Sequence, residues 1–339
     1  MSHLPRVLFV DDDEAVLAGL NVMMRKQRKR YEIASAVGGR AGIQEATRAT
    51  FDVVITDMRM PDVDGASVLE AVRDHDPTTF RIVLSGFSDR NATNRAFPLT
   101  HQFLDKPCDS KLLVSTLDRA CALRAVYGSP AMRALVSRLV QVASPGDATS
   151  EPDSAVSART LRLALSQFLG TESVPRGPET AAARALADFA RARLALPIPG
   201  FSLAAFKLRS AAMAESVQKA TTSPDLFGDA FTAGLVHEVG RVLVAVGLPA
   251  EHAEIELAAR GSGVPRSVIE RRILGVTEAE LAAYVLTLQG IPLAVIEAVA
   301  FHDSETVLSS PLSVALRAAH ARHDHLREGD APALETAGA

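Results

Sequence analysis

The sequence has 339 residues, of which 47% are apolar and 22% are charged, and 36 basic side chains against 40 acidic ones leave a net charge of −4. This composition excludes an intrinsically disordered chain, and the length suits two domains of roughly 150 residues each. The only two cysteines, Cys108 and Cys121, exclude a disulfide framework and a cysteine-rich zinc module.

The N-terminal sequence MSHLPRVLFVDDD is neither a signal peptide nor the start of a membrane span. No later stretch approaches the roughly 18 uncharged apolar residues that a membrane helix needs. We therefore expect a soluble, cytoplasmic protein without membrane contact.

Short apolar runs alternate with amphipathic stretches over residues 1–125. The predicted strands are 6–10, 31–35, 53–56, 81–84 and 102–104, and the predicted helices are 13–28, 39–49, 64–75, 89–97 and 109–126. Asp64, Ser88 and Asp109 are the expected N-caps of the last three helices. Five βα units predict an α/β doubly wound five-stranded parallel sheet of the flavodoxin type, with helices on both faces.

Residues 126–154 are expected to form a helical and flexible linker, because a short helical piece precedes the loop-like sequence SPGDATSEPDS. From 155 to 328 we find no convincing strands, and apolar residues recur with the period of an α-helix. The predicted helices are 155–169, 178–195, 201–220, 226–246, 249–260, 265–272, 277–289, 292–302 and 311–328. An all-helical domain over 155–328 and a disordered tail at 329–339 follow.

Polar side chains follow four of the predicted strands directly. Asp11 and Asp12 follow the first strand, Asp57 the third, Ser85 ends the fourth, and Lys106 follows the fifth. In such sheets ligands bind at the carboxyl ends of the strands, so these side chains should converge. Three carboxylates there suit Mg²⁺, and a carboxylate beside the ion can attack phosphorus to give an acyl phosphate on Asp57.

The motifs VLFVDDD, VVITDMRMPDVDG, RIVLSG and FLDKP resemble the receiver domain of two-component response regulators over about 120 residues. The resemblance implies that Asp57 is the phosphoacceptor, and that Asp11, Asp12, Asp57 and the backbone carbonyl of Arg59 bind Mg²⁺. It further implies that Lys106 senses the phosphoryl group, and that Ser85 and Phe103 form the switch. A sensor histidine kinase or a phosphotransfer protein is the implied phosphodonor.

Two residues of the receiver region refine this interpretation. Gly86 occupies a position that is often Ala in the family. Pro107 is expected to follow a cis peptide bond, because a tight turn there would aim Lys106 inward.

The sequence GLVHEVGRVLVAVGLP at 234–249 resembles the HDOD and HD superfamily. The segments 154–170 and 273–304 resemble the opening and closing parts of the same domain. Metal-dependent HD hydrolases carry a His-Asp pair, for which this chain has His237-Glu238, and Arg209 stands where a histidine is expected. His302-Asp303 replaces a His-His pair, and the GYP motif of cyclic-di-GMP phosphodiesterases is absent. We therefore predict a degenerate, non-catalytic output domain that contacts an unidentified protein, in a chain that is not otherwise an enzyme.

Two alternatives stay open. One is an HD-type cyclic-dinucleotide phosphodiesterase gated by the receiver, with metal at His237, Glu238 and Asp303. The other is a DNA-binding regulator, against which the net charge of −4 argues, because phosphate contacts need a basic excess.

Three further features of the sequence allow weaker predictions. The basic run from Arg25 to Arg30 is expected to complement the end of a helix dipole rather than to bind nucleic acid. His320, His323 and His325 are interpreted as a solvated surface rather than a metal site. A homodimer through residues 109–142 is a further hypothesis.

Overall fold

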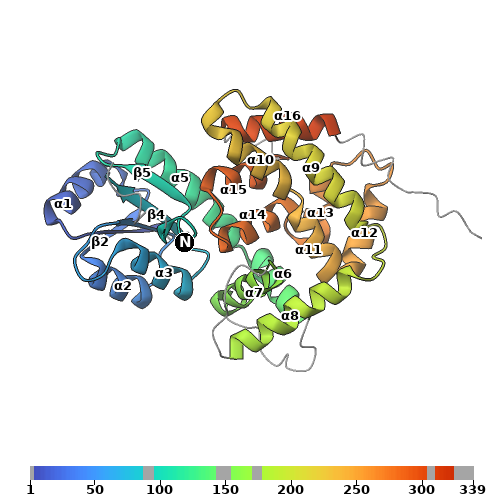
Figure 1. Cartoon of the computed structure of the whole chain (residues 1–339), viewed down its shortest axis with the longest axis horizontal. Helices are drawn as coiled ribbons and strands as arrows, with labels where there is room; N and C mark the ends of the chain where they lie inside the picture. Colours follow the sequence, from blue (N-terminus) through green and yellow to red (C-terminus); the bar gives the residue numbers. More distant parts are fainter. Residues whose placement is uncertain (1–3, 87–94, 143–153, 170–177, 304–309, 324–339) are drawn as a thin grey trace, which may run out of the picture. The chain divides into compact units, whose positions relative to one another are not determined.

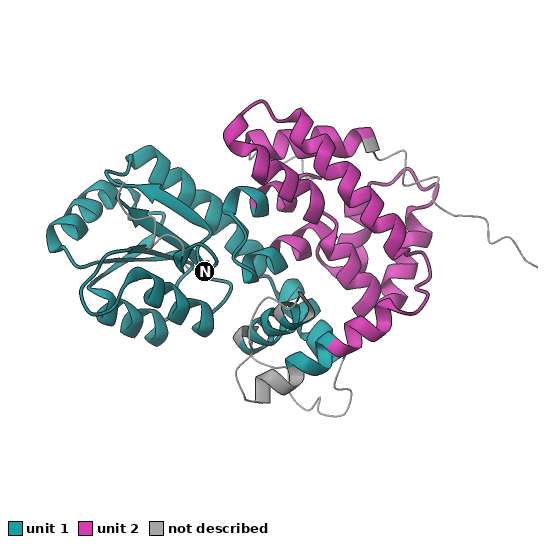
Figure 2. Cartoon of the chain, in the orientation of Figure 1, with its two compact units in different colours: residues 1–187, 284–296 teal, residues 188–283, 297–339 magenta. Residues whose placement is uncertain are grey.

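The computed structural model describes residues 4–86, 95–142, 154–169, 178–303 and 310–323. The chain divides into two compact units (Figure 2). Unit 1 comprises residues 1–187 and 284–296, and unit 2 comprises residues 188–283 and 297–339. The predicted domain boundaries stay a prediction, because the units are defined by compactness and not by domain type.

The five predicted strands form one sheet in which every neighbouring pair is parallel. The strands are β1 (Arg6–Asp11), β2 (Glu32–Val37), β3 (Val53–Asp57), β4 (Phe80–Ser85) and β5 (Gln102–Asp105). Their order across the sheet is β2-β1-β3-β4-β5. The central strand β3, with the sequence VVITD, is buried along its whole length, as expected for a strand covered on both faces. The predicted fold class is confirmed.

Helices cover both faces of this sheet (Figure 1). The helices of the sheet region are α1 (Glu14–Met23), the 3-10 turn η1 (Met24–Gln27), α2 (Gly39–Arg48), α3 (Gly65–His75) and α5 (Ser110–Tyr127). On one face, α2 and α3 pack Ala46, Val68 and Val72 against Leu8 and Val54 of the sheet. The other face is covered by α1 and α5, whose buried residues include Leu17, Leu20, Leu113 and Leu117.

Two of the predicted N-caps are confirmed by hydrogen bonds. The side chain of Asp64 accepts from the Ser67 amide at the start of α3, and that of Asp109 accepts from the Leu112 amide at the start of α5. The predicted cap Ser88 and most of the predicted helix 89–97 lie outside the described residues. Two more helices of this unit follow, α6 (Pro130–Gln141) and α7 (Ser154–Leu169).

A helical hairpin from the C-terminal part of the chain belongs to unit 1. It consists of Tyr284–Ile296, the second half of α14 (Glu278–Leu288), a turn, and the first half of α15 (Leu293–Phe301). Gly290 makes the turn with φ of +70°, and a Cβ there would lie 2.7 Å from the Pro98 carbonyl oxygen. Only glycine meets both conditions, which lets the turn approach the backbone just before β5.

Unit 2 is helical throughout its described residues, apart from an isolated bridge between Ile198 and Phe201. Its helices are α8 from Asp188 on (whole helix Pro178–Leu194), α9 (Leu203–Ala220), the 3-10 turn η2 (Pro224–Leu226), α10 (Phe227–Val236), α11 (Val239–Gly247), α12 (Pro249–Ala259), α13 (Arg266–Leu274), the first half of α14, the end of α15, and α16 (Pro311–His323). α10 packs along α9, and α16 packs against both.

One predicted helix differs from the structure in a way that concerns function. The stretch 226–246 is not one helix, because α10 ends at Val236 and α11 begins at Val239. The break falls at His237 and Glu238, so these two side chains leave the backbone at a junction between helices. The apolar period continues through the break, which is why the sequence did not reveal it.

Among the described residues, one stretch, Pro224–Gly247, is long and apolar enough by composition to cross a membrane. Half of its most apolar window is buried inside the protein, and core helices pass the same test. The stretch also contains the break at His237.

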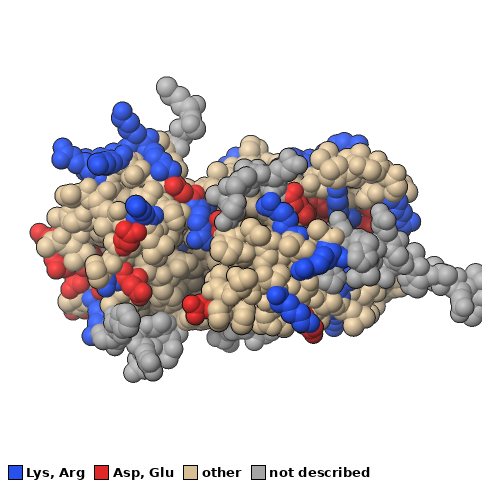
Figure 3. All heavy atoms as spheres, turned by 90° about the horizontal axis from the view of Figure 1, so that it is seen from above, with Lys and Arg blue, Asp and Glu red and all other residues tan. Residues whose placement is uncertain are grey.

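The basic run from Arg25 to Arg30 lies on η1 and the turn after it, and its five cationic side chains are exposed. Figure 3 shows Lys and Arg side chains gathered at the upper left of the view. Elsewhere on that face, basic and acidic side chains are interspersed. Arg30 is paired with Asp118 of α5, so part of this charge is neutralised within unit 1.

Candidate functional site

Two aspartates and one lysine meet at the carboxyl edge of the sheet. Asp11 ends β1, Asp57 ends β3, and Lys106 follows β5. The Lys106 ammonium lies 2.8 Å from Asp11 Oδ2 and also binds Asp57 Oδ1. Burial acts to lower the pKa of Lys106, but hydrogen bonds from its ammonium to Asp11 and Asp57 outweigh burial and raise it. Lys106 is therefore a fixed cation between two carboxylates that are almost fully buried.

Backbone amides hold the second oxygen of each carboxylate. The Arg59 amide donates to Asp57 Oδ2 at 2.7 Å, and the Asp13 amide donates to Asp11 Oδ1 at 3.0 Å. These bonds hold both side chains in one orientation. The Lys106–Pro107 peptide bond is cis, as the sequence predicted.

Gly65, at the start of α3, permits the close packing behind Asp57. A Cβ at this position would lie 2.1 Å from the Asp57 carbonyl oxygen, and the Gly65 amide donates to the Met58 carbonyl at 3.1 Å. The glycine of the motif PDVDG is therefore required by contact with the backbone of Asp57 itself.

The other predicted receiver residues lie at the same edge. Ser85 ends β4, is paired with Asp105 in the β4–β5 register, and accepts the Lys106 amide on its carbonyl oxygen at 2.9 Å. Its hydroxyl donates to the Gly86 carbonyl at 3.1 Å. The side chains of Asp12 and Arg59 are exposed.

Phe103 lies on β5, three residues before Lys106, and is half-buried. Its ring stacks on that of Phe97, with centroids 6.4 Å apart, and it packs against a core cluster that includes Met58, Leu69 and Val83. This position couples the end of β5 to the packing of α3.

The residues at this edge fit a hard divalent cation. Asp11 and Asp57 are charged, and their oxygens converge on one ammonium. Mg²⁺ prefers oxygen ligands of this type, one or two carboxylates together with waters.

In unit 2, the predicted HD positions separate into two groups. Glu238 lies between two guanidinium groups, 3.7 Å from Arg209 Nε and 3.8 Å from Arg241 Nη1. His237 and His302 instead lie with their rings in edge-to-face contact, centroids 5.9 Å apart. The pair His237-Glu238 thus directs its two side chains to different neighbours.

A third histidine, His320 on α16, joins His237 and His302. Its ring centroid lies 4.7 Å from that of His302 and 5.7 Å from that of His237. The interpretation of His320 as a solvated surface residue was wrong, because its side chain is buried. The positions 312, 315, 316 and 319 form the buried apolar face of α16, and residue 320 is adjacent to that face. This spacing is the signal in the sequence that would have placed His320 inside; the side chains of His323 and His325 lie outside the described part of the structure.

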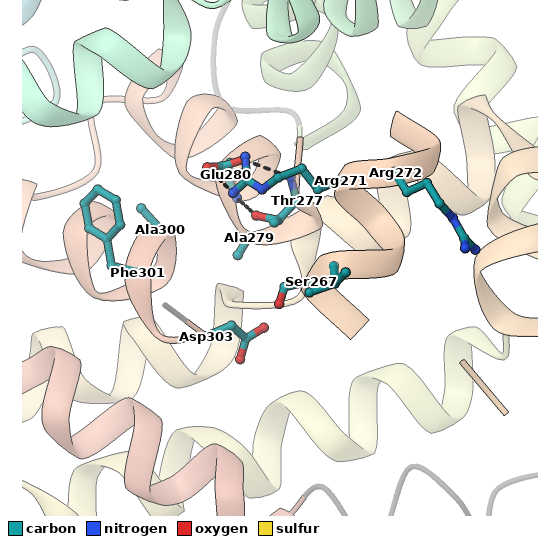
Figure 4. A pocket seen from close by; sticks show the side chains of 10 residues that line it. Ser267, Arg271, Arg272, Thr277, Ala279, Glu280, Ala300, Phe301 and Asp303 are labelled. Carbon is teal, nitrogen blue, oxygen red and sulfur yellow. Dashed lines mark hydrogen bonds and ion pairs between the residues drawn. The ribbon is translucent and has the colours of Figure 1, made fainter. Parts of the chain in front are cut away.

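A pocket of about 560 Å³ is lined by Asp303, the residue after His302 (Figure 4). Asp303, Phe301, Ser267, Arg271 and Thr277 are among the residues that line it. In Figure 4 Arg271 pairs with Glu280, whose Oε1 lies 2.9 Å from Arg271 Nη2.

The chain matches two protein-family models. Residues 7–118 match the response regulator receiver domain, and residues 180–305 match the HDOD domain. The chain joins a receiver domain to an HDOD domain. Both resemblances seen in the sequence are thereby confirmed.

Curated relatives of this chain include two transcriptional regulatory proteins. The transcriptional regulatory protein ZraR of Salmonella typhimurium is 29% identical over 160 residues, which cover 42% of this chain and 36% of ZraR. The transcriptional regulatory protein PrrA of Mycobacterium bovis is 42% identical over 84 residues, which cover 25% of this chain and 35% of PrrA. The chain thus spans about a third of the length of these relatives.

Solved structures also match this chain. The receiver domain of an HD domain-containing protein from Pseudomonas fluorescens Pf-5 is 25% identical, with a TM-score of 0.35, and the match covers 37% of this chain and 92% of that one. The chemotaxis response regulator CheY4 of Vibrio cholerae is 27% identical, with a TM-score of 0.32, covering 35% of this chain and 99% of that one.

Proposed function

We propose that this response regulator is controlled by phosphorylation of Asp57, and that its HDOD domain acts without catalysis, by contacting another protein. The observation that carries the proposal is the Lys106 ammonium held between the carboxylates of Asp11 and Asp57. A receiver needs a charged carboxylate beside a fixed cation, and this arrangement supplies both.

Each residue of the site has a role in the proposed transfer. Asp11, Asp12, Asp57 and the Arg59 carbonyl would hold Mg²⁺, which neutralises charge on the phosphoryl group. The Asp57 carboxylate attacks phosphorus, a P–O bond forms, and the bond from phosphorus to the donor breaks. The donor is a phosphohistidine of a sensor kinase or phosphotransfer protein, protonated on its other ring nitrogen, so that it leaves as a neutral imidazole. Lys106 and the Ser85 hydroxyl then bind the phosphoryl oxygens.

Strand β5 provides a route from this site to the C-terminal hairpin of unit 1. Lys106 follows one end of β5, and His101 precedes the other. The His101 carbonyl accepts the Leu293 amide at 2.8 Å, and His101 Nε2 lies 3.0 Å from the Thr287 carbonyl oxygen. The helices α14 and α15 continue from this hairpin into unit 2. We propose that phosphorylation, which adds about −1.5 to −2 charges, shifts Ser85, Phe103 and β5 and thereby alters the hairpin.

Several further expectations belong to this proposal. The protein would work in the cytoplasm, where histidine kinases present their phosphoryl groups, and a homodimer through residues 109–142 would be a means of output. The phosphodiesterase and DNA-binding alternatives are less well supported. Glu238, which the former would use as a metal ligand, lies between Arg209 and Arg241, and the net charge of −4 does not favour the latter.

The test is labelling by a small acyl phosphate with Mg²⁺, read by intact mass. Wild-type protein should gain one phosphoryl group, and Asp57→Asn should gain none. Asp62→Asn is the matched control, because Asp62 is an exposed carboxylate of the same loop whose φ of 65° asparagine tolerates. Labelling of Asp57→Asn at the wild-type level would refute the assignment. Capture of partner proteins with phosphorylated and unphosphorylated protein then tests the output.

A further inference from the structure

Three helices of unit 2 each direct one histidine into a common cluster. His237 caps the C-terminus of α10, His302 follows the end of α15, and His320 lies on α16. All three side chains are buried, and each ring is in edge-to-face contact with the other two. Asp303 completes the group and is partly exposed.

Hydrogen bonds define which ring nitrogen carries the proton in two of the histidines. His237 Nδ1 lies 2.8 Å from the Gly234 carbonyl oxygen, and His302 Nδ1 lies 2.8 Å from the Val299 carbonyl oxygen. A carbonyl oxygen only accepts, so Nδ1 is the donor in both rings, and the lone pair of the neutral imidazole is on Nε2. A backbone carbonyl on the second nitrogen is the usual support of a metal-binding histidine.

The carboxylate of Asp303 faces the rings of His302 and His320. Its Oδ1 lies 3.3 Å from His302 Nε2 and 3.5 Å from His320 Nδ1. A carboxylate oxygen and an Nε2 lone pair repel each other unless a proton or a cation lies between them. Ligand atoms at about 2.0–2.1 Å from a tetrahedral ion are about 3.3 Å apart, which is close to the two distances from Asp303 Oδ1.

We propose that His302, Asp303 and His320 bind a divalent transition-metal ion, zinc foremost, beside the ring of His237. Two imidazoles and one carboxylate, with a water in the fourth position, suit zinc and related first-row metals, whereas Mg²⁺ and Ca²⁺ prefer oxygen ligands. The ligand atoms of His302, Asp303 and His320 all lie within 4.8 Å of one another. The ion would fasten α16, which lies beyond the part of the chain that matches the HDOD domain, to the end of α15.

This site differs in its ligands from the two metal sites considered above, and it shares Asp303 with the HD-type site. It uses two imidazoles and one carboxylate of unit 2, whereas the magnesium ligands are all oxygens of the receiver. It also leaves out Glu238, which pairs with arginines, and recruits His320 instead. Asp303 lines the pocket of Figure 4 and is partly exposed, so solvent reaches one ligand of the proposed site.

The experiment uses the full chain, purified without a histidine tag and stripped with a chelator. It is then loaded with zinc, or with cobalt as a spectroscopic probe, and passed over a chelating resin. We expect about one zinc per chain by elemental analysis, a raised melting temperature, and the visible absorption of tetrahedral cobalt(II).

Two variants remove proposed ligands, and two control variants test whether the zinc binds elsewhere on the chain. His320→Gln and Asp303→Asn should bind zinc at least about tenfold more weakly and lose the cobalt spectrum, and Asp303, being partly exposed, is the variant least prone to misfold. Asp57→Asn, which alters the receiver site, and the double variant His323→Gln/His325→Gln, which alters the rest of the histidine run, should both bind as wild type does. The proposal is overturned if the stripped protein takes up no stoichiometric zinc. It is also overturned if Asp303→Asn and His320→Gln, shown folded by circular dichroism, retain wild-type zinc and the cobalt spectrum.

Discussion

His101 Nε2 lies 3.0 Å from the carbonyl oxygen of Thr287, a residue 186 positions farther along the chain. The other ring nitrogen, Nδ1, accepts the amide of Arg81 at 2.9 Å. Nδ1 is therefore the hydrogen-bond acceptor, and Nε2 carries the proton and donates to the Thr287 carbonyl. The histidine thus joins the start of β4 to the C-terminal hairpin of unit 1.

This contact predicts a pH dependence of stability. Burial, and next the charge of Arg81, lower the pKa of His101 well below its ordinary value. The unfolded chain therefore takes up a proton at a higher pH than the folded chain does. Neutral His101 contributes its full stabilisation at a pH above about 6.5, the pKa of histidine in the unfolded chain. As the pH falls from there to the folded pKa of His101, the free energy of unfolding decreases by about 1.4 kcal/mol per pH unit.

The measurement is urea unfolding between neutral pH and mildly acid pH, for wild type and His101→Gln. Glutamine keeps a donor and an acceptor but cannot take up a proton, so its stability should change less over this range. Equal slopes for the two proteins would show that His101 is not the group responsible.

Tyr127 and Thr287 predict a second coupling within unit 1. The Tyr127 hydroxyl lies 2.7 Å from Thr287 Oγ1, and both groups are buried. We expect Tyr127→Phe and Thr287→Val each to lower the free energy of unfolding by about 0.5–1.5 kcal/mol. The double variant should cost less than the sum of the single variants, because the second change removes a group that has already lost its partner. Additive effects in this double-mutant cycle would mean that the hydroxyls do not interact.

Gly65 predicts a steric effect on the phosphorylation site. Gly65→Ala places a Cβ 2.1 Å from the Asp57 carbonyl oxygen, so the backbone of Asp57 or of α3 must move. We expect a loss of about 1–3 kcal/mol in the free energy of unfolding, together with slower labelling by acyl phosphate.

Gly86→Ala is the control for that change. A Cβ at Gly86 meets no atom of the described residues within 4 Å, and Ala is often found at this position in receivers, so stability should stay within about 0.5 kcal/mol of wild type. Equal effects at both glycines would contradict the steric argument.

Lys106 predicts an electrostatic effect. Lys106→Met removes the cation between Asp11 and Asp57, and the two buried carboxylates then repel each other. The free energy of unfolding at neutral pH should fall by about 1–3 kcal/mol, and added Mg²⁺ should restore part of it, because the ion takes the place of the lost charge. Lys111→Met removes an exposed lysine nearby and should change neither quantity. A Lys106→Met protein as stable as wild type without Mg²⁺ would show that the ammonium is not needed to hold the two carboxylates.

The sequence by itself determined the receiver fold and the composition of its site. Each of Asp11, Asp57, Ser85 and Lys106 stands at the end of a strand, and parallel strands bring those ends to one edge, so local patterns settle which residues meet. The break between α10 and α11 at His237 and Glu238 was decided by packing, because the apolar period runs through it unchanged.

Only the tertiary structure decided the partners of His101 and His320. Both side chains are buried, and their partners are Thr287 for the first and His302 and Asp303 for the second. The sequence does not indicate which distant group will form a hydrogen bond with a given buried polar side chain. Its burial depends on the apolar residues beside it, which bring two distant segments together and enclose the polar pair between them.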